Sequence, residues 1–244
     1  MECDVIVLAG GKGTRLKEVS GDIPKPLVPV EDNAVFLDYI LAWLASAGVQ
    51  RVILSLCYCS ESFKAYLCRR SWPFKVDLLV EPEPLGTGGA IKYILEAIPI
   101  SVHFGVVNGD TFLDFDLSSM ERAALENPLP GMIGLSYVEN TDRYGKVSVE
   151  NGRVTAFLEK NQGEPPGWIN NGCYFFDRRI FATSQKKFSL ERDLFPSLTR
   201  KELLAAFETQ GAFIDIGIPE DFHRFLAMEN RRLSTLNREI EGKK

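Results

Sequence analysis

Short apolar segments alternate with helix-like segments over the first 110 residues, and this alternation restricts the fold more than any other feature of the chain. The apolar segments are rich in β-branched residues and end at glycine or polar residues, as strands buried on both faces do. The segments between them carry apolar residues at helical spacing. The expected strands are Asp4–Ala9, Arg51–Cys57, Lys75–Glu81 and His103–Asp110, and the expected helices are Ala34–Gly48, Ser60–Arg70 and Gly88–Ile98, the last with Thr87 as its N-cap. The pattern predicts an α/β fold with parallel strands and helices on both faces of the sheet.

The second half of the chain has a different character. Residues 146–160 alternate around Asn151-Gly152, which is a strong β-hairpin signal. Further strands are expected at Trp168–Asp177 and Gly211–Gly217, and a helix opened by a proline and two acids is expected at Pro219–Leu233. We therefore expect a mixed sheet with a β-rich second half, in one domain.

Composition excludes some function classes. The net charge of -5 and the pI near 5.3 argue against a general nucleic-acid binder, although a local cluster of Lys and Arg can still bind an anion. The five cysteines are odd in number and irregularly spaced, without a paired C-x-x-C, so free thiols are favoured over a zinc site. Cys57 and Cys59 have the spacing of two residues on one face of a strand. The N-terminal apolar run is too short for a signal peptide or a membrane helix, and we expect a cytoplasmic protein.

A glycine-rich loop follows the first expected strand, in the stretch VLAGGKGTRLKEVSGDIPKPLVPV. Gly10, Gly11 and Gly13 would let backbone N–H groups approach phosphate oxygens. Arg15 offers a planar fork for phosphate, and Lys25 stands between two prolines that restrict its backbone. The loop lacks the Walker A pattern, and the third Rossmann glycine is replaced by a leucine. A plain glycine turn with surface charges remains the alternative.

Two aspartates are candidates for binding a metal ion. Asp110 follows Asn-Gly at a strand end, and Asp215 lies between apolar residues in another strand. Buried acids need a partner or a metal, and Mg²⁺ binds through one or two carboxylates together with substrate phosphates. A turn or cap for Asp110 and a hydrogen-bonded buried acid for Asp215 are the alternatives. Asp114 and Asp116 are expected to introduce the helix that follows.

Several motifs should meet at one edge of the sheet. The glycine loop, the stretch EPEPLGTGG and the stretch NGD each follow an expected parallel strand, and ligands of such sheets bind beyond the carboxyl ends of the strands. In the second half, Glu159-Lys160 and Asn170-Asn171-Gly172 offer groups that suit sugar hydroxyls. Taken alone, each of these two clusters is better explained as a surface salt bridge or a turn.

Together, these motifs closely resemble the sugar-1-phosphate nucleotidylyltransferases. The resemblance covers Val5 to about Arg224 and rests on LAGGKGTRL, PKPL, PLGTGGA, NGD, YGKV, FLEK, NNG and IDIG. It implies a Rossmann-like α/β/α sandwich with a mixed, mostly parallel sheet, a nucleotide-binding half at about 1–116, a sugar-binding half at about 117–233 and a tail at 234–244. It also implies a Mg²⁺-dependent reaction of an NTP with a sugar 1-phosphate, giving an NDP-sugar and pyrophosphate.

The resemblance assigns roles by position. Arg15, Lys25 and Asp110 would be catalytic, and Asp110 and Asp215 would hold Mg²⁺. The nucleotide-binding residues would be Leu8, Ala9, Gly10, Gly11, Gly13, Thr14, Arg15, Glu81, Gly86, Thr87, Asn108 and Gly109. The residues for the sugar phosphate would be Gly145, Glu159, Lys160, Asn171 and Gly172.

The subtype follows from finer features. The short spacer before GDIPKP, together with PLGTGGAI and NGDTFLDFDL, is most similar to the D-glycero-α-D-manno-heptose 1-phosphate guanylyltransferases, so GTP and a heptose 1-phosphate are the expected substrates. Mannose-1-phosphate guanylyltransferases and uridylyl-, thymidylyl- or cytidylyltransferases are the alternatives, followed by a non-catalytic domain that binds nucleotide sugars. A dinucleotide-dependent dehydrogenase fits the glycine spacing poorly. The sequence leaves the oligomeric state open, with a homodimer as one option.

Overall fold

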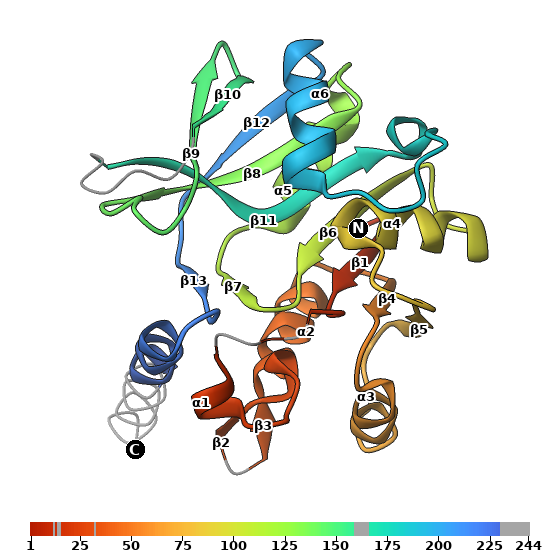
Figure 1. Cartoon of the computed structure of the whole chain (residues 1–244), viewed down its shortest axis with the longest axis vertical. Helices are drawn as coiled ribbons and strands as arrows, with labels where there is room; N and C mark the ends of the chain where they lie inside the picture. Colours follow the sequence, from red (N-terminus) through yellow and green to blue (C-terminus); the bar gives the residue numbers. More distant parts are fainter. Residues whose placement is uncertain (12, 14–15, 32, 159–165, 230–244) are drawn as a thin grey trace, which may run out of the picture.

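The fold is built around one nine-stranded mixed sheet (Figure 1). It is seen in a computed structural model of the chain that describes residues 1–11, 13, 16–31, 33–158 and 166–229. The strands are ordered β5-β4-β1-β6-β11-β8-β12-β10-β9 across the sheet. Two small two-stranded sheets, β2 with β3 and β7 with β13, lie beside it.

The first four strands of the sheet are parallel, as the alternation predicted. They are β1 (Asp4–Leu8), β4 (Arg51–Leu56), β5 (Lys75–Val80) and β6 (His103–Asn108). Each ends one or two residues before the predicted end, although the amides of Ala9, Glu81 and Gly109 still donate hydrogen bonds to the neighbouring strand. The prediction that Cys57 and Cys59 lie on one face of a strand was wrong. Both lie in the loop after β4, and Cys59 has a left-handed φ of 56°.

Helices cover both faces of the sheet and confirm the α/β/α arrangement. On one face, α2 (Phe36–Ser46), α3 (Ser60–Leu67), α5 (Leu117–Glu126) and a helix at residues 219–229 share a core with Val5 and Val7 of β1. On the other face, α4 (Gly86–Ala97) and α6 (Phe195–Arg200) share a second core with Ile6. The alternating side chains of β1 therefore enter both cores, which is why this strand is apolar throughout.

Helix starts show where local signals succeeded and failed. Asp116 is the N-cap of α5, and its carboxylate accepts a hydrogen bond from the Ser118 amide, as expected. The N-cap of α4 is Leu85, so the prediction that Thr87 caps this helix was wrong. The Leu85 side chain makes no capping hydrogen bond, and the Gly88 and Gly89 amides of the first turn donate instead to the carbonyl oxygen of Phe188.

The β-rich second half extends the same sheet. β11 (Gly167–Asp177) pairs antiparallel with both β6 and β8 (Gly131–Val138), and β12 (Leu204–Thr209) pairs parallel with β8. The predicted hairpin is present as β9 (Lys146–Glu150) and β10 (Arg153–Leu158). Asn151 and Gly152 both have positive φ angles, as a primed two-residue turn requires.

The remaining elements are short. They are α1 (Lys17–Ser20), η2 (Lys25–Leu27), β2 (Pro29–Glu31), β3 (Ala34–Val35), β7 (Thr111–Leu113), η3 (Arg178–Phe181), η4 (Leu190–Leu194) and β13 (Phe213–Asp215). The strand expected at Gly211–Gly217 is thus limited to its three central residues. It pairs with β7 and not with the large sheet, which brings it beside the loop that follows β6.

We predict that the aromatic cluster around Phe195 is essential for stability. The ring of Phe195 is fully buried and lies 5.6 Å from that of Phe157 and 5.2 Å from that of Tyr174, measured between centroids. Phe195→Ala should lower the free energy of unfolding by about 3–5 kcal/mol, measured by urea denaturation. Leu125→Ala, at a position on α5 that is 44% exposed, is the control and should change it little. A loss for Phe195→Ala no larger than that of the control would contradict the packing described.

Candidate nucleotide-binding site

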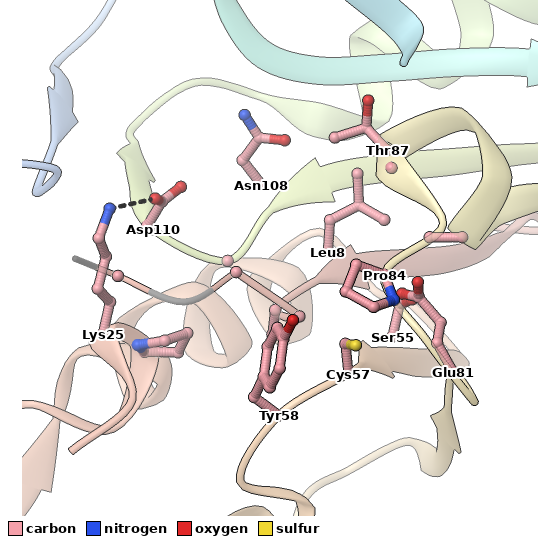
Figure 2. A pocket seen from close by; sticks show the side chains of 18 of the residues that line it. Leu8, Lys25, Ser55, Cys57, Tyr58, Glu81, Pro84, Thr87, Asn108 and Asp110 are labelled. Atoms are coloured by element: carbon pink, nitrogen blue, oxygen red, sulfur yellow. Dashed lines mark hydrogen bonds and ion pairs between the residues drawn. The ribbon is translucent and has the colours of Figure 1, made fainter. Parts of the chain in front are cut away.

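A pocket of about 540 Å³ opens at the carboxyl ends of β1, β4, β5 and β6 (Figure 2). β1 lies between β4 and β6, so the connections after the parallel strands diverge here and leave a crevice, as the sheet topology predicts. All of the expected nucleotide-binding residues that the structure describes line it: Leu8, Ala9, Gly10, Gly11, Gly13, Glu81, Gly86, Thr87, Asn108 and Gly109. Lys25 and Asp110 line it as well, whereas Thr14 and Arg15 lie outside the described residues.

The glycine loop forms part of this wall. Gly13 has a φ of +63°, and a Cβ atom there would lie 2.8 Å from Cγ of Lys25. Nothing lies within 4 Å of a Cβ built on Gly11. A side chain at position 13 would therefore collide with the side chain of Lys25. At Gly11, the missing side chain leaves the backbone N–H and C=O groups accessible beside the pocket.

Lys25 and Asp110 form an ion pair at one end of the pocket, where Figure 2 shows the two side chains pointing toward each other. The distance from Lys25 Nζ to Asp110 Oδ2 is 3.0 Å, and the lysine side chain is only 10% exposed. Lys25 begins the 3-10 helix η2, directly after Pro24, and this turn directs it inward. A buried ammonium group and a carboxylate therefore lie side by side, which suits a site for phosphate and a metal cation.

The opposite end of the pocket holds the buried carboxylate of Glu81, beside Ser55 (Figure 2). Glu81 accepts hydrogen bonds from the Leu85 amide at 3.1 Å and from the Ser55 hydroxyl at 3.4 Å. Burial raises the pKa of Glu81 above its usual value, and the two hydrogen bonds act in the opposite direction. The group is an oriented hydrogen-bond acceptor in a largely apolar environment.

The glycines at the start of α4 are explained in part by packing. Gly86 has a φ of +77°, and a Cβ there would lie 2.6 Å from the carbonyl oxygen of Phe188. The amides of Gly88 and Gly89 both donate to that same oxygen at 3.1 Å. The segment before η4 therefore lies directly on the N-terminus of α4, and this contact carries Glu191 of η4 to the pocket wall.

The second candidate metal ligand, Asp215, lies in a segment whose backbone is hydrogen-bonded to the segment of Asp110. Asp215 pairs with Thr111 in the β13–β7 ladder, and the Ile216 amide donates to the carbonyl oxygen of Asp110 at 3.0 Å. Asp215 is not among the residues that line the pocket, and its Oδ1 accepts from the Gly217 amide at 2.8 Å. The part of the chain that the structure describes has no cluster of three or more His, Cys, Asp or Glu side chains able to hold a metal ion.

The residues expected to bind the sugar phosphate are only partly placed. Glu159 and Lys160 lie outside the described residues. A Cβ on Gly172, whose φ is +81°, would lie 2.5 Å from Nδ2 of Asn108, so Gly172 abuts a residue of the pocket wall. Gly145 lies in the loop before β9, where a Cβ would lie 3.2 Å from the carbonyl oxygen of Leu158.

Asn171 is buried and is not among the residues that line the pocket. Its side chain is 1% exposed, and its amide nitrogen donates to the hydroxyls of Ser136 and Thr209, each at 3.3 Å. Its amide oxygen accepts from the Cys173 amide at 3.1 Å. These bonds use both amide hydrogens and one lone pair of the oxygen in a side chain that the sheet encloses, and the role of Asn171 toward the sugar stays a prediction.

Sequence reasoning missed several residues of the pocket. Ser55, Cys57 and Tyr58 come from the end of β4 and the loop that follows it, and Glu191 comes from η4. The first three could have been predicted, since β4 is one of the parallel strands whose carboxyl ends meet at the pocket. No local pattern marks Glu191, because only the contact of its segment with α4 brings it to the pocket.

Other predicted properties concern the environment of the protein. The five cysteines are not joined in disulfides, and Cys3 and Cys173 are buried. Within the described residues, none of the helices combines the length and apolar character needed to traverse a bilayer.

Comparison with known proteins identifies relatives over nearly the whole chain. The profile of the nucleotidyl transferase family matches residues 4–231. The chain is 38% identical to the D-glycero-alpha-D-manno-heptose 1-phosphate guanylyltransferase of Campylobacter jejuni, over 91% of this chain and 97% of that protein. It is 34% identical to mannose-1-phosphate guanyltransferase beta-B of Xenopus laevis, over 89% of this chain but 62% of that protein.

The crystal structure of HddC from Yersinia pseudotuberculosis complexed with GMP-PN is also similar. The TM-score is 0.80 and the identity is 40%, with 91% of this chain and 97% of that chain covered. The order of the motifs, the pocket at the end of the parallel strands and these similarities lead to one conclusion: the chain belongs to the nucleotidyl transferase family.

Proposed function

We propose that this protein transfers a guanylyl group from GTP to a sugar 1-phosphate, with D-glycero-α-D-manno-heptose 1-phosphate as the preferred acceptor. The observation that carries the proposal is the pocket, which has Lys25 and Asp110 at one end and the buried Glu81 at the other. A nucleotide has the same polarity, with charged phosphates at one end and a base with N–H donors at the other. The similarity to a heptose 1-phosphate guanylyltransferase over nearly its full length supports the acceptor.

The two halves of the chain would divide the substrates between them. Residues at about 1–116 would bind the nucleotide, and residues at about 117–233, including Gly145 and Gly172, would bind the sugar phosphate. Glu159 and Lys160 are assigned to the sugar and its phosphate by the resemblance alone. Cysteines that are not joined in disulfides are compatible with the reducing cytoplasm, where we place the reaction.

The chemistry would require positioning more than acid–base catalysis. A phosphate oxygen of the sugar 1-phosphate attacks the α-phosphorus of GTP, the bond from that phosphorus to the β-phosphate oxygen breaks, and pyrophosphate leaves. The attacking oxygen is already an anion, so no general base is needed. The obstacle is repulsion between two anions, which Lys25, Arg15 and Lys160 would offset while the reactants are held in line.

A divalent metal fits the same end of the pocket. Asp110 lines the pocket, and the hydrogen bond from Ile216 to the Asp110 carbonyl brings the chain of Asp215 beside it. Two carboxylates plus substrate phosphates are an oxygen donor set that suits Mg²⁺, and these aspartates would hold it. When bound, Mg²⁺ would neutralise part of the triphosphate charge. Lys25 lies 3.0 Å from Asp110, so its ammonium group would stand beside both the metal and the substrate phosphates.

Glu81 is the proposed reader of guanine. The N1–H and the 2-amino group of guanine are adjacent donors that a single carboxylate can accept together. Thymine and uracil present only one donor on the corresponding edge, and cytosine presents an amino group beside an unprotonated nitrogen. A buried carboxylate oriented by Leu85 and Ser55 therefore favours guanine over the pyrimidines.

The substrate assignment is tested by a matrix of NTPs against sugar 1-phosphates, scored by pyrophosphate release. The set should include GTP, ATP, UTP, CTP and dTTP, with heptose, mannose and glucose 1-phosphates as acceptors. GTP with heptose 1-phosphate should give the highest kcat/KM, and EDTA should abolish the reaction until Mg²⁺ is restored. The proposal is wrong if another nucleotide is preferred or if no pair releases pyrophosphate.

Lys25→Ala should reduce kcat by about 10²–10³-fold, because it removes a cation placed at the reacting phosphates. The fold should persist, as judged by circular dichroism and the melting temperature. Lys64→Ala is the matched control, since Lys64 lies on α3, is 53% exposed and pairs with Glu61 on the same helix. Equal turnover for Lys25→Ala and Lys64→Ala would remove Lys25 from the mechanism.

Glu81→Gln should weaken discrimination between GTP and ITP, which lacks the 2-amino group, by about 10-fold or more in kcat/KM. A pH dependence follows as well. The ionised carboxylate is present above the pKa of Glu81, and burial raises this pKa, so GTP binding should be lost on acidification at a higher pH than an exposed glutamate would give. Binding titrations from pH 8 to pH 5 measure this loss, and Glu81→Gln should abolish the pH dependence. Unchanged base preference and an unchanged pH profile in the variant would contradict the assignment.

A further inference from the structure

Glu191 is a carboxylate on the pocket wall to which neither the sequence motifs nor the proposed mechanism assigns a role. It belongs to η4, a short π-helical turn of a kind often found at functional sites. Two hydroxyl groups converge on one of its oxygens. The Thr87 hydroxyl donates to Oε2 at 2.9 Å, and the Ser189 hydroxyl donates to the same atom at 2.6 Å.

Both hydroxyl groups are themselves oriented by the backbone. The Leu190 amide donates to the Thr87 oxygen at 2.8 Å, and the Arg192 amide donates to the Ser189 oxygen at 3.2 Å. Because each hydroxyl oxygen accepts a backbone N–H, its proton is directed to Glu191. The carboxylate is therefore held in one orientation as a hydrogen-bond acceptor.

The other carboxylate oxygen, Oε1, has no hydrogen-bond partner among the residues that the structure describes. Glu191 is exposed and lines the pocket, so Oε1 is available to a ligand. A fixed negative charge repels phosphate and accepts O–H or N–H donors. The wall at Glu191 thus selects an uncharged, donor-bearing part of the ligand.

Thr87, which is hydrogen-bonded to Glu191, indicates which part of a bound ligand would lie beside Glu191. Figure 2 shows Thr87 apart from the Lys25–Asp110 pair and apart from Glu81. This step rests on the proposed function, in which the phosphates lie at the Lys25–Asp110 pair and the base lies at Glu81. The parts of the substrates that remain for Glu191 are then the sugar rings. These rings carry hydroxyl groups as their only strong donors.

We propose that Oε1 of Glu191 accepts a hydrogen bond from a substrate hydroxyl group, on either the ribose of the nucleotide or the acceptor sugar, and that Thr87 and Ser189 hold Glu191 in place for this contact. Glu191 is thereby a specificity-determining residue for a polyhydroxylated ligand. The conservative variant Glu191→Gln tests this role well. Its amide oxygen can still accept from Thr87 and Ser189, while its amide nitrogen puts a donor where the acceptor Oε1 stood.

The experiment removes substrate hydroxyl groups one at a time in the wild-type protein and in Glu191→Gln. The ribose arm uses GTP, 2′-deoxy-GTP and 3′-deoxy-GTP, and the sugar arm uses mannose 1-phosphate and its monodeoxy analogues. In the wild type, loss of the contacted hydroxyl should lower kcat/KM by roughly 10- to 100-fold, mainly through KM. In Glu191→Gln the intact substrate should already be poor, and the same deletion should change kcat/KM less than 2-fold. The substrate series in which Glu191→Gln removes the loss of kcat/KM identifies whether Glu191 contacts the ribose or the acceptor sugar.

Controls separate this inference from the proposed function and from a folding defect. Glu96→Gln, at a position on α4 that is 62% exposed and pairs with Lys92, should behave as the wild type with every analogue. Calorimetric binding of GTP and its deoxy forms, and of GDP-mannose and its deoxy forms, measures both arms without turnover. A failure of wild-type pyrophosphate release would thus overturn the proposed function while leaving the binding comparison in force. Equal deletion penalties in wild type and Glu191→Gln in both arms, by kinetics and by binding, would overturn the role of Glu191.

Discussion

The two parallel ladders that flank β1 are the constraint on which the site depends. Because β4 and β6 pair with β1 in parallel, the chain leaves these strands at the same edge, and β5 adds a fourth exit beside them. The pocket residues on these exits come from positions as far apart in the chain as Leu8 and Asp110. Their proximity is a property of the ladder registers, and the apolar side chains of β1 stabilise those registers from both faces of the sheet.

Charge within the pocket is divided between its ends. At one end the buried Lys25 pairs with Asp110, and the other end encloses Glu81, whose pKa is raised by burial. Each partner of the ion pair is suited to a different component, the lysine to phosphate and the aspartate to a metal. We interpret the pair as a preorganised arrangement, which reduces the cost of arranging charge at the moment of reaction.

The contact between α4 and the segment before η4 links two regions that the sequence does not connect. Gly86, Gly88 and Gly89 are required where they are because Phe188 and its neighbours occupy the space of their side chains. The same contact orients Thr87 and carries Glu191 to the pocket. A motif that resembles a ligand-binding loop is thus also a packing surface, and its glycines serve both purposes.

The sequence by itself determined the parallel half of the fold and most of the nucleotide pocket. Alternating apolar and helical periodicities specify strands and helices locally, and the carboxyl ends of parallel strands must meet, so Gly10, Glu81 and Asp110 could be placed together in advance. The Asn151-Gly152 hairpin was also predictable, since its turn depends only on two residues with positive φ. Only the tertiary structure decided that Asn171 is enclosed by hydrogen-bonded neighbours, that Leu85 and not Thr87 is the N-cap of α4, and that Glu191 reaches the pocket. Each of these depends on a contact between segments distant in sequence, and the periodicity within one segment does not predict such contacts.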